Sequence, residues 1–100
     1  MHNVNLENHL LVFYGTECPH CEHMSRLVAR FEEEHGVRLE KIEIWHNEEN
    51  ARLMESYDVD GACGGVPFFY NTQSKGWLCG EVTYEQIIDW ANGAKTAFVN

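Results

Sequence analysis

The stretch LLVFYGTECPHC, residues 10–21, decides the fold of this chain. Its first five residues, 10–14, are all apolar, and a short apolar run that stops at a Gly-Thr pair is typical of a strand buried on both faces. Pro19 suits the first position of a helix, because the N–H that proline lacks would be unpaired there anyway. The stretch therefore predicts a buried strand followed closely by a helix, with Cys18 and Cys21 at the junction.

The remaining elements follow from hydrophobic periodicity and turn residues. Apolar residues recur every three or four positions after Pro19, and Gly36 suits the end of that helix. Further along, the pattern predicts a strand at about 38–45, a helix capped by Asn47, a polar loop at 58–65, strands at 66–70 and 76–79 joined by a hairpin, a helix from Thr83 to Gly93 and a frayed tail at 94–100. We expect an α/β fold of order β-α-β-α-β-β-α, with a four-stranded mixed sheet flanked by three helices. One domain covers residues 1–100, with its core at about 10–93.

The composition excludes several classes of function. The chain has 100 residues and a formal charge of −9, so it lacks the clustered basic residues that nucleic acids and anionic membranes require. Its longest uninterrupted apolar stretch, residues 10–14, is far too short to cross a bilayer, and residues 1–5 show no signal peptide. We therefore expect a cytoplasmic monomer with no membrane or nucleic-acid partner. In that compartment a close cysteine pair is more often catalytic or metal-binding than structural.

The Cys-Pro-His-Cys motif supplies the chemistry. Unpaired N–H groups and the partial positive charge at a helix N-terminus stabilise a thiolate, and Cys18 lies closest to them. We expect Cys18 to be the nucleophile and Cys21, one turn further, to be the resolving thiol that attacks the mixed disulfide. Protonated His20, between the two, adds positive charge near Cys18.

These features resemble the thioredoxin superfamily over about residues 10–92. The matching pieces are residues 13–21, the Val66-Pro67 pair and Gly80 before the last helix. The resemblance implies that Pro67 is cis and faces the dithiol, and that Val66 contacts an extended protein substrate through its backbone. It also implies that Tyr14 borders the dithiol and shapes substrate access. The motif itself, with Pro19 and His20 between the cysteines, is similar to that of the DsbA family of periplasmic oxidases.

The chain departs from the thioredoxin pattern at several positions. Val12 stands where thioredoxins carry a buried carboxylate, while Lys41 matches the lysine that neighbours it. The short N-terminus is more like that of a glutaredoxin, yet Thr16 and Glu17 replace the basic residue that holds glutathione there. The reductant is therefore left open between a flavoprotein reductase and glutathione, as are the direction of electron flow and a glutathione-dependent function.

A metal-binding module is the main rival interpretation. Cys18, Cys21, His23 and Cys63 would supply ligands for zinc or part of an iron–sulfur cluster, but a second CxxC is lacking, so we expect no bound metal or cofactor. A non-enzymatic binding domain is disfavoured because the dithiol is retained. Cys63 is a candidate third redox thiol or the partner of Cys79 in a regulatory disulfide, although the favoured interpretation makes both small packing residues.

Overall fold

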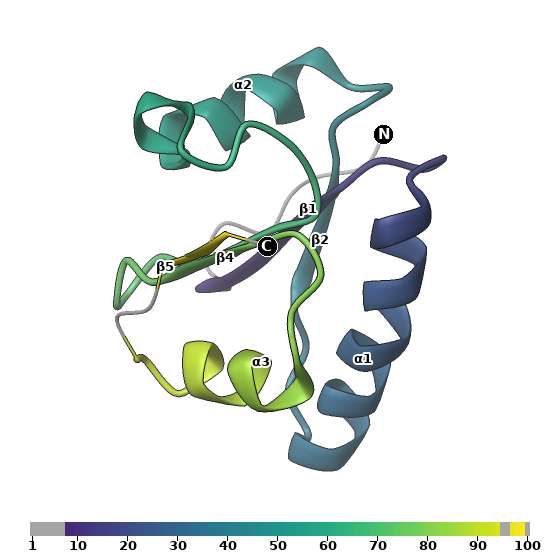
Figure 1. Cartoon of the computed structure of the whole chain (residues 1–100), viewed down its shortest axis with the longest axis vertical. Helices are drawn as coiled ribbons and strands as arrows, with labels where there is room; N and C mark the ends of the chain where they lie inside the picture. Colours follow the sequence, from purple (N-terminus) through teal and green to yellow (C-terminus); the bar gives the residue numbers. More distant parts are fainter. Residues whose placement is uncertain (1–7, 95–96, 100) are drawn as a thin grey trace.

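Five strands form one mixed sheet in the order β2-β1-β3-β4-β5 (Figure 1). The computed structural model describes residues 8–94 and 97–99. The strands are β1 (Leu10–Tyr14), β2 (Glu40–Glu43), β3 (Phe68–Asn71), β4 (Trp77–Cys79) and β5 (Ala97–Val99). β1 pairs in parallel with β2 and antiparallel with β3, while β4 is antiparallel to β3 and parallel to β5. The strand that leads into the Cys-Pro-His-Cys motif thus lies inside the sheet, paired on both sides.

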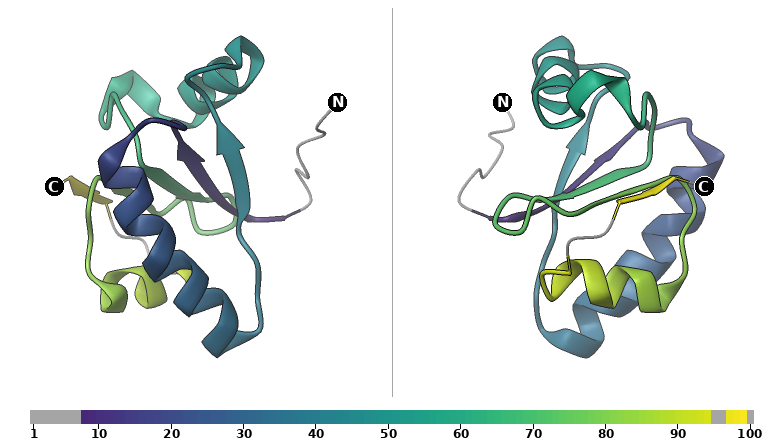
Figure 2. Two further views of the ribbon diagram at one scale, coloured as in Figure 1. Left: turned by 90° about the vertical axis from the view of Figure 1, so that its right-hand side faces the viewer. Right: turned by 60° about the vertical axis from the view of Figure 1, so that its left-hand side comes forward.

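The helices cover both faces of this sheet. α1 (Pro19–His35) and α3 (Tyr84–Ala91) lie on one face, and α2 (Glu48–Tyr57) lies on the other, followed by the short 3₁₀ turn η1 (Val59–Gly61) (Figures 1 and 2). Each α-helix has a side-chain N-cap, and the predicted capping box of Thr83 with Gln86 is present. Within residues 8–94 and 97–99, no helix combines the length and apolar character needed to cross a membrane.

Alternation along β1 explains why its whole sequence is apolar. Leu10 and Val12 pack in the cluster formed with α1 and α3, whereas Leu11 and Phe13 pack in the cluster formed with α2. Successive side chains of a strand point to opposite faces, so a strand covered by helices on both faces needs apolar residues at every position. The resulting rigid strand delivers the loop at residues 15–18 to one edge of the core.

The predicted strands and helices are all present, with three corrections. β2 is shorter than 38–45, and β3 begins at Phe68, because Val66 and Pro67 belong to the loop before it. The predicted frayed tail at 94–100 is wrong for residues 97–99, which pair with β4 and make the sheet five-stranded rather than four-stranded. A three-residue strand offers too few positions for periodicity to reveal it. The rest of that prediction, at 95–96 and 100, lies outside the described residues.

Candidate active site

Cys18 caps the N-terminus of α1 with its own sulfur atom. Its backbone is extended (φ −84°, ψ 114°), and its Sγ accepts the N–H of Cys21 at 3.2 Å. The Cys18 N–H in turn donates to the carbonyl of Gly15 at 3.1 Å, which closes the turn after β1. This placement confirms Pro19 as the first residue of the helix and Cys18 as the residue just before it. The sulfur occupies the position where a capping oxygen usually binds, in the field of the helix N-terminus.

Cys21 lies one helical turn further, and its environment is different. Both sulfurs belong to buried residues, with exposed fractions of 5% for Cys18 and 7% for Cys21, and both are thiols. Burial, followed by the side-chain hydrogen bond with Cys18, raises the pKa of the Cys21 thiol to about 12. Cys21 therefore holds its proton firmly as long as Cys18 is beside it in the reduced form.

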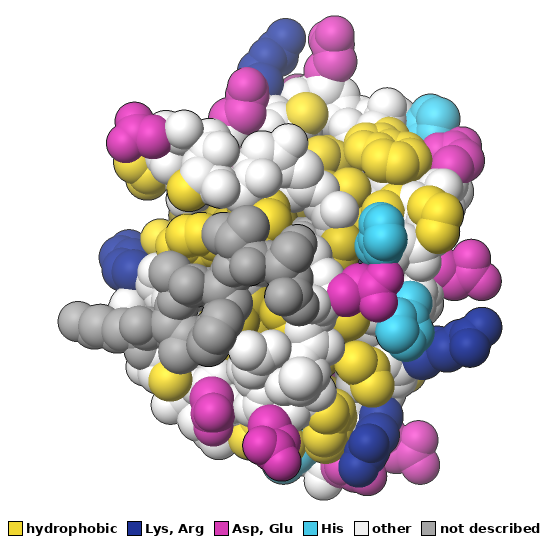
Figure 3. All heavy atoms as spheres, in the orientation of Figure 1, with side chains coloured by type: hydrophobic (Ala, Val, Ile, Leu, Met, Phe, Trp, Pro, Cys, Tyr) yellow, Lys and Arg dark blue, Asp and Glu magenta, His cyan; other side chains and the backbone are white. Residues whose placement is uncertain are grey.

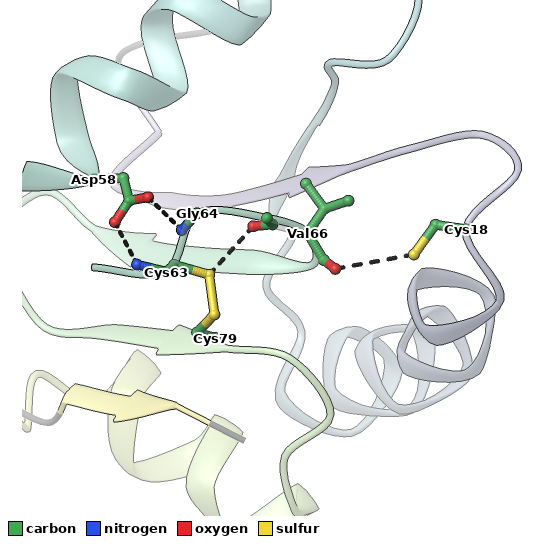
Figure 4. Close-up of a disulfide and its surroundings, with 7 residues drawn as sticks. Cys18, Asp58, Cys63, Gly64, Val66 and Cys79 are labelled. Atoms are coloured by element: carbon green, nitrogen blue, oxygen red, sulfur yellow. Dashed lines mark hydrogen bonds between the residues drawn. A yellow bond between two sulfur atoms is a disulfide. The ribbon is translucent and has the colours of Figure 1, made fainter. Parts of the chain in front are cut away.

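The Val66-Pro67 pair lies opposite the dithiol. The peptide bond between them is cis, which confirms the conformation implied by the resemblance. The Cys18 thiol points at the carbonyl oxygen of Val66, 3.9 Å away (Figure 4). Val66 is half-buried and Pro67 is buried, so the pair forms a fixed wall facing the motif. The contact of Val66 with substrate stays a prediction.

Two hollows flank this arrangement. The first, here called the apolar pocket, has a volume of about 290 Å³ and is lined by Tyr14, Cys21, Lys41 and Pro67 among others. Tyr14 is thus at the rim of the site, where it was predicted. Lys41 also lies at this pocket, but its Nζ is paired with a Glu32 carboxylate oxygen 2.6 Å away. The second hollow, the disulfide groove, has a volume of about 390 Å³ and is lined by His20, Cys63, Gly65, Val66, Cys79, Gly80 and Glu81.

Glu81 is a site residue that the sequence did not reveal. Its two carboxylate oxygens separately hydrogen-bond Nδ1 of His20 and Nδ1 of His23. These hydrogen bonds, with His20 first and His23 second, lower the pKa of the Glu81 carboxyl. In the space-filling view, histidine and acidic side chains meet on the side of the molecule where α1 begins (Figure 3). The predicted positive charge of His20 therefore faces the Glu81 carboxylate, which lies 61 residues further along the chain. No local sequence pattern could predict a contact over that separation.

The last residue of β2 and a residue just after it hold the loop that precedes Cys18. The Trp45 ring lies against Gly15 so closely that a Cβ atom there would come within 2.2 Å of it. Thr16 donates from its backbone N–H and its hydroxyl to one Glu43 oxygen, each at 3.0 Å. Trp45 remains 50% exposed and does not belong to the buried core. It covers the turn into the motif instead, a role that depends on the parallel pairing of β1 with β2.

Cys63 and Cys79 form a disulfide, with their Cα atoms 5.6 Å apart. The favoured interpretation of both as packing residues is wrong, and the alternative of a Cys63–Cys79 disulfide is the one present. The strand register explains the pairing: Cys79 lies opposite Phe68, and Cys63 comes from the loop that enters β3 (Figure 4). The carboxylate of buried Asp58 fixes that loop by accepting the N–H groups of Cys63 and Gly64, each at 2.8 Å.

The disulfide also changes the rival metal interpretation. The Cys63 sulfur is bonded to Cys79 and is not a free thiolate ligand, while His23 is bonded to Glu81. Across the part of the chain that the structure describes, no group of three or more His, Cys, Asp or Glu residues is arranged to hold a metal ion. The four-ligand set considered from the sequence is therefore not assembled.

Comparison of the chain with models of protein families and with curated proteins finds no match. The geometry provides a sulfur at a helix N-terminus, a second thiol that retains its proton, and a backbone carbonyl facing the first sulfur. A nucleophilic sulfur with a second sulfur within one turn is the minimum required for a two-step thiol–disulfide exchange.

Proposed function

We propose that this protein is a thiol–disulfide oxidoreductase of the thioredoxin type that exchanges its Cys18/Cys21 pair with disulfides of protein substrates. The observation that carries the proposal is the position of the Cys18 sulfur, which caps α1 and faces the Val66 carbonyl across the site. A cysteine at a helix N-terminus favours its thiolate, and the thiolate is the form that attacks disulfides. The α/β topology and the cis Val66-Pro67 bond are both compatible with the resemblance noted in the sequence.

The reaction proceeds in two balanced steps. In the reducing direction, the Cys18 thiolate attacks one sulfur of a substrate disulfide, forms a mixed disulfide, and releases the other substrate sulfur as a thiolate that takes up a proton. Cys21 then loses its proton and attacks the Cys18 sulfur, which releases the second substrate thiol. Two electrons pass from the Cys18/Cys21 dithiol to the substrate, and the Cys18–Cys21 disulfide remains. The oxidising direction is the reverse of these steps.

The contrast between the two thiols orders these steps. Burial keeps the pKa of Cys21 high, and the hydrogen bond and charge of the Cys18 sulfur raise it further. Once Cys18 is in a mixed disulfide, its sulfur no longer carries a charge that opposes the Cys21 thiolate. Formation of the mixed disulfide therefore makes Cys21 more acidic and prepares it to resolve the complex.

Neighbouring groups position the substrate. An extended substrate segment would run beside Val66, whose half-buried side chain fixes the backbone that faces Cys18. Tyr14 lines the apolar pocket beside the dithiol and limits access from that side. A flavoprotein reductase or glutathione would return the pair to its dithiol state. We place this activity in the cytoplasm and in a monomer, in line with the sequence expectations.

Turnover of insulin with dithiothreitol as the electron donor tests the proposal. We expect Cys18→Ser to lower the rate to that of dithiothreitol alone, and Cys21→Ser to accumulate a mixed disulfide that mass spectrometry detects at Cys18. Ser56→Ala, an exposed position on α2, is the matched control and should keep the wild-type rate. A wild-type rate in Cys18→Ser would refute the assignment.

A glutathione redox buffer distinguishes the two candidate reductants. Equilibration of the wild-type chain with reduced and oxidised glutathione gives the fraction of the Cys18–Cys21 disulfide by mass. A stable glutathione adduct on Cys18 would favour the glutathione-dependent function. Direct exchange to the internal disulfide without an adduct would favour a flavoprotein reductase as the partner.

A further inference from the structure

The Cys63–Cys79 disulfide lies in the same groove as the reactive motif, and the reaction above does not use it. His20 of the motif, Val66 and both half-cystines line the disulfide groove. Cys63 is half-buried and its Sγ is 3.2 Å from the Gly65 carbonyl oxygen, whereas Cys79 is only 8% exposed. An external thiolate that enters the groove therefore meets the Cys63 sulfur first.

The disulfide tethers one end of the short loop that contains Val66, the predicted substrate contact. Phe68 pairs with Cys79 in the sheet, and the Gly80 N–H donates to the Pro67 carbonyl at 2.9 Å. Four residues, 64–67, separate Cys63 from Phe68, so the disulfide and the β3–β4 pairing hold this loop at both ends. The Val66 carbonyl that faces Cys18 belongs to this loop.

The sequence of the loop makes its shape dependent on such restraints. Gly64 has a positive φ of 70°, Gly65 follows it, and both are exposed. Glycine gains more backbone freedom than any other residue when a restraint is removed. The Asp58 carboxylate still binds the N–H groups of Cys63 and Gly64, so its restraint ends before Gly65. The bond to Cys79 adds a covalent restraint from β4 at Cys63, on the side of the segment that faces the groove.

We propose that Cys63–Cys79 is a regulatory redox site, and that its reduction by a dithiol loosens the 64–67 loop and weakens binding of protein substrates at Cys18. The substrate clause of this inference rests on the function proposed above. In the cytoplasm expected from the sequence, the disulfides that do form are usually transient and either catalytic or redox-sensing. A bond that an external thiol can reach through a groove fits that description.

Reduction follows ordinary exchange chemistry. A thiolate of the dithiol attacks the Cys63 sulfur, the Cys63–Cys79 bond breaks, and Cys79 leaves as a thiolate that takes up a proton. The second thiol of the reductant then attacks the mixed disulfide, which forms the reductant's own disulfide and releases Cys63 as a thiol. Two electrons and two protons pass from the dithiol to the pair, and Cys18 and Cys21 take no part.

The first experiment asks whether the bond is redox-active in the folded protein. The Cys18→Ser/Cys21→Ser chain is incubated with dithiothreitol under native conditions, and free thiols are alkylated and counted by mass while circular dichroism follows the fold. We expect Cys63 and Cys79 to be alkylated with the fold retained. Reduction only when the protein unfolds would overturn the proposal and make the bond purely structural.

The second experiment measures the consequence for the loop. Backbone amide exchange at Gly64 and Gly80 is compared between the oxidised and reduced forms of the same Cys18→Ser/Cys21→Ser chain, because these N–H groups bind Asp58 and the Pro67 carbonyl at the two ends of the loop. We expect exchange at both to be at least several-fold faster after reduction, while exchange in β1 is unchanged. Equal exchange in the two forms would overturn the inference whatever reaction the protein performs.

The third experiment measures the consequence for the substrate. Insulin turnover is compared between the wild-type chain, with Cys63–Cys79 intact, and Cys63→Ser/Cys79→Ser, under a reductant concentration that the first experiment shows to leave the wild-type bond intact. We expect the KM to rise about tenfold in the variant, the cost of ordering a few loop residues on binding. Alkylation of Cys18 by iodoacetamide does not require a substrate to bind along the 64–67 loop, so it should proceed at the same rate in both proteins.

These outcomes separate the two proposals. Equal KM values in the two proteins would refute the regulatory role while leaving the oxidoreductase intact. Absence of insulin turnover in both proteins would refute the proposed function, and with it the substrate clause. In that case the exchange comparison still decides whether the Cys63–Cys79 bond controls the loop.

Discussion

The Asp58 carboxylate holds the loop that enters the site, and its replacement should be costly. Asp58 is 7% exposed, and its two oxygens accept the N–H groups of Cys63 and Gly64, both at 2.8 Å. Hydrogen bonds to a charged group contribute about 1.5 to 3 kcal/mol each to stability. Asp58→Asn keeps one acceptor oxygen at roughly half the strength of a charged one and turns an NH₂ group toward the other N–H.

From this arrangement we expect the free energy of unfolding of Asp58→Asn to fall by about 2 to 3 kcal/mol. For a domain of this size, such a loss lowers the Tm by roughly 8 to 24 °C. Urea unfolding of the oxidised protein, followed by circular dichroism, measures the first quantity and calorimetry the second. Backbone amide exchange gives a local readout, since the N–H groups of Cys63 and Gly64 should exchange faster.

Asp60→Asn is the matched control. Asp60 is exposed and has a positive φ of 60°, a conformation that asparagine tolerates as well as aspartate does. The same chemical change should therefore alter the stability by less than about 0.5 kcal/mol. An equal loss of stability in Asp58→Asn and Asp60→Asn would refute the view that the Asp58 carboxylate holds the loop.

Three further predictions concern the surroundings of the motif. Because burial and Cys18 raise the pKa of Cys21 to about 12, we expect a single equivalent of iodoacetamide at neutral pH to modify Cys18 and not Cys21, as peptide mass mapping would show. Gly15→Ala would bring a Cβ within 2.2 Å of the Trp45 ring, so the ring must move, and its indole N–H resonance should shift by NMR. The Glu17 carboxylate accepts a hydrogen bond from the His46 ring and so raises the pKa of His46, and Glu17→Gln should lower that pKa in an NMR titration.

The sign of the His46 effect on stability follows from linkage. A histidine whose pKa is raised by folding adds stability that is fully present below its ordinary pKa and is lost as the pH rises through the folded value. The Glu17–His46 pair therefore favours the fold on the acidic side of neutrality. An unchanged His46 titration in Glu17→Gln would contradict the Glu17–His46 contact. Alkylation of Cys21 together with Cys18 at neutral pH would contradict the raised pKa of Cys21. An unshifted Trp45 resonance in Gly15→Ala would contradict the contact between Gly15 and the Trp45 ring.

Local sequence was sufficient for the parts of the site that lie close together in the chain. The apolar run at 10–14 predicts a strand buried on both faces, and Pro19 predicts where the next helix begins. Together they place Cys18 at the helix N-terminus, because strand, turn and helix start lie within twelve residues. The cis conformation of the Val66-Pro67 bond was implied by the family resemblance and could not be predicted from hydrophobic periodicity.

Contacts between distant segments were decided by the tertiary structure alone. The sequence favoured a packing role for Cys63 and Cys79, because they lie sixteen positions apart in the chain and only the β3–β4 register brings them within bonding distance. Glu81 reaches His20 across 61 residues, and Trp45 reaches Gly15 through the pairing of β2 with β1. The sequence by itself therefore determined the position of the Cys18/Cys21 pair and the order of the elements around it. The tertiary structure determined which groups surround that pair, because side chains far apart in the chain meet only when strands pair and helices pack.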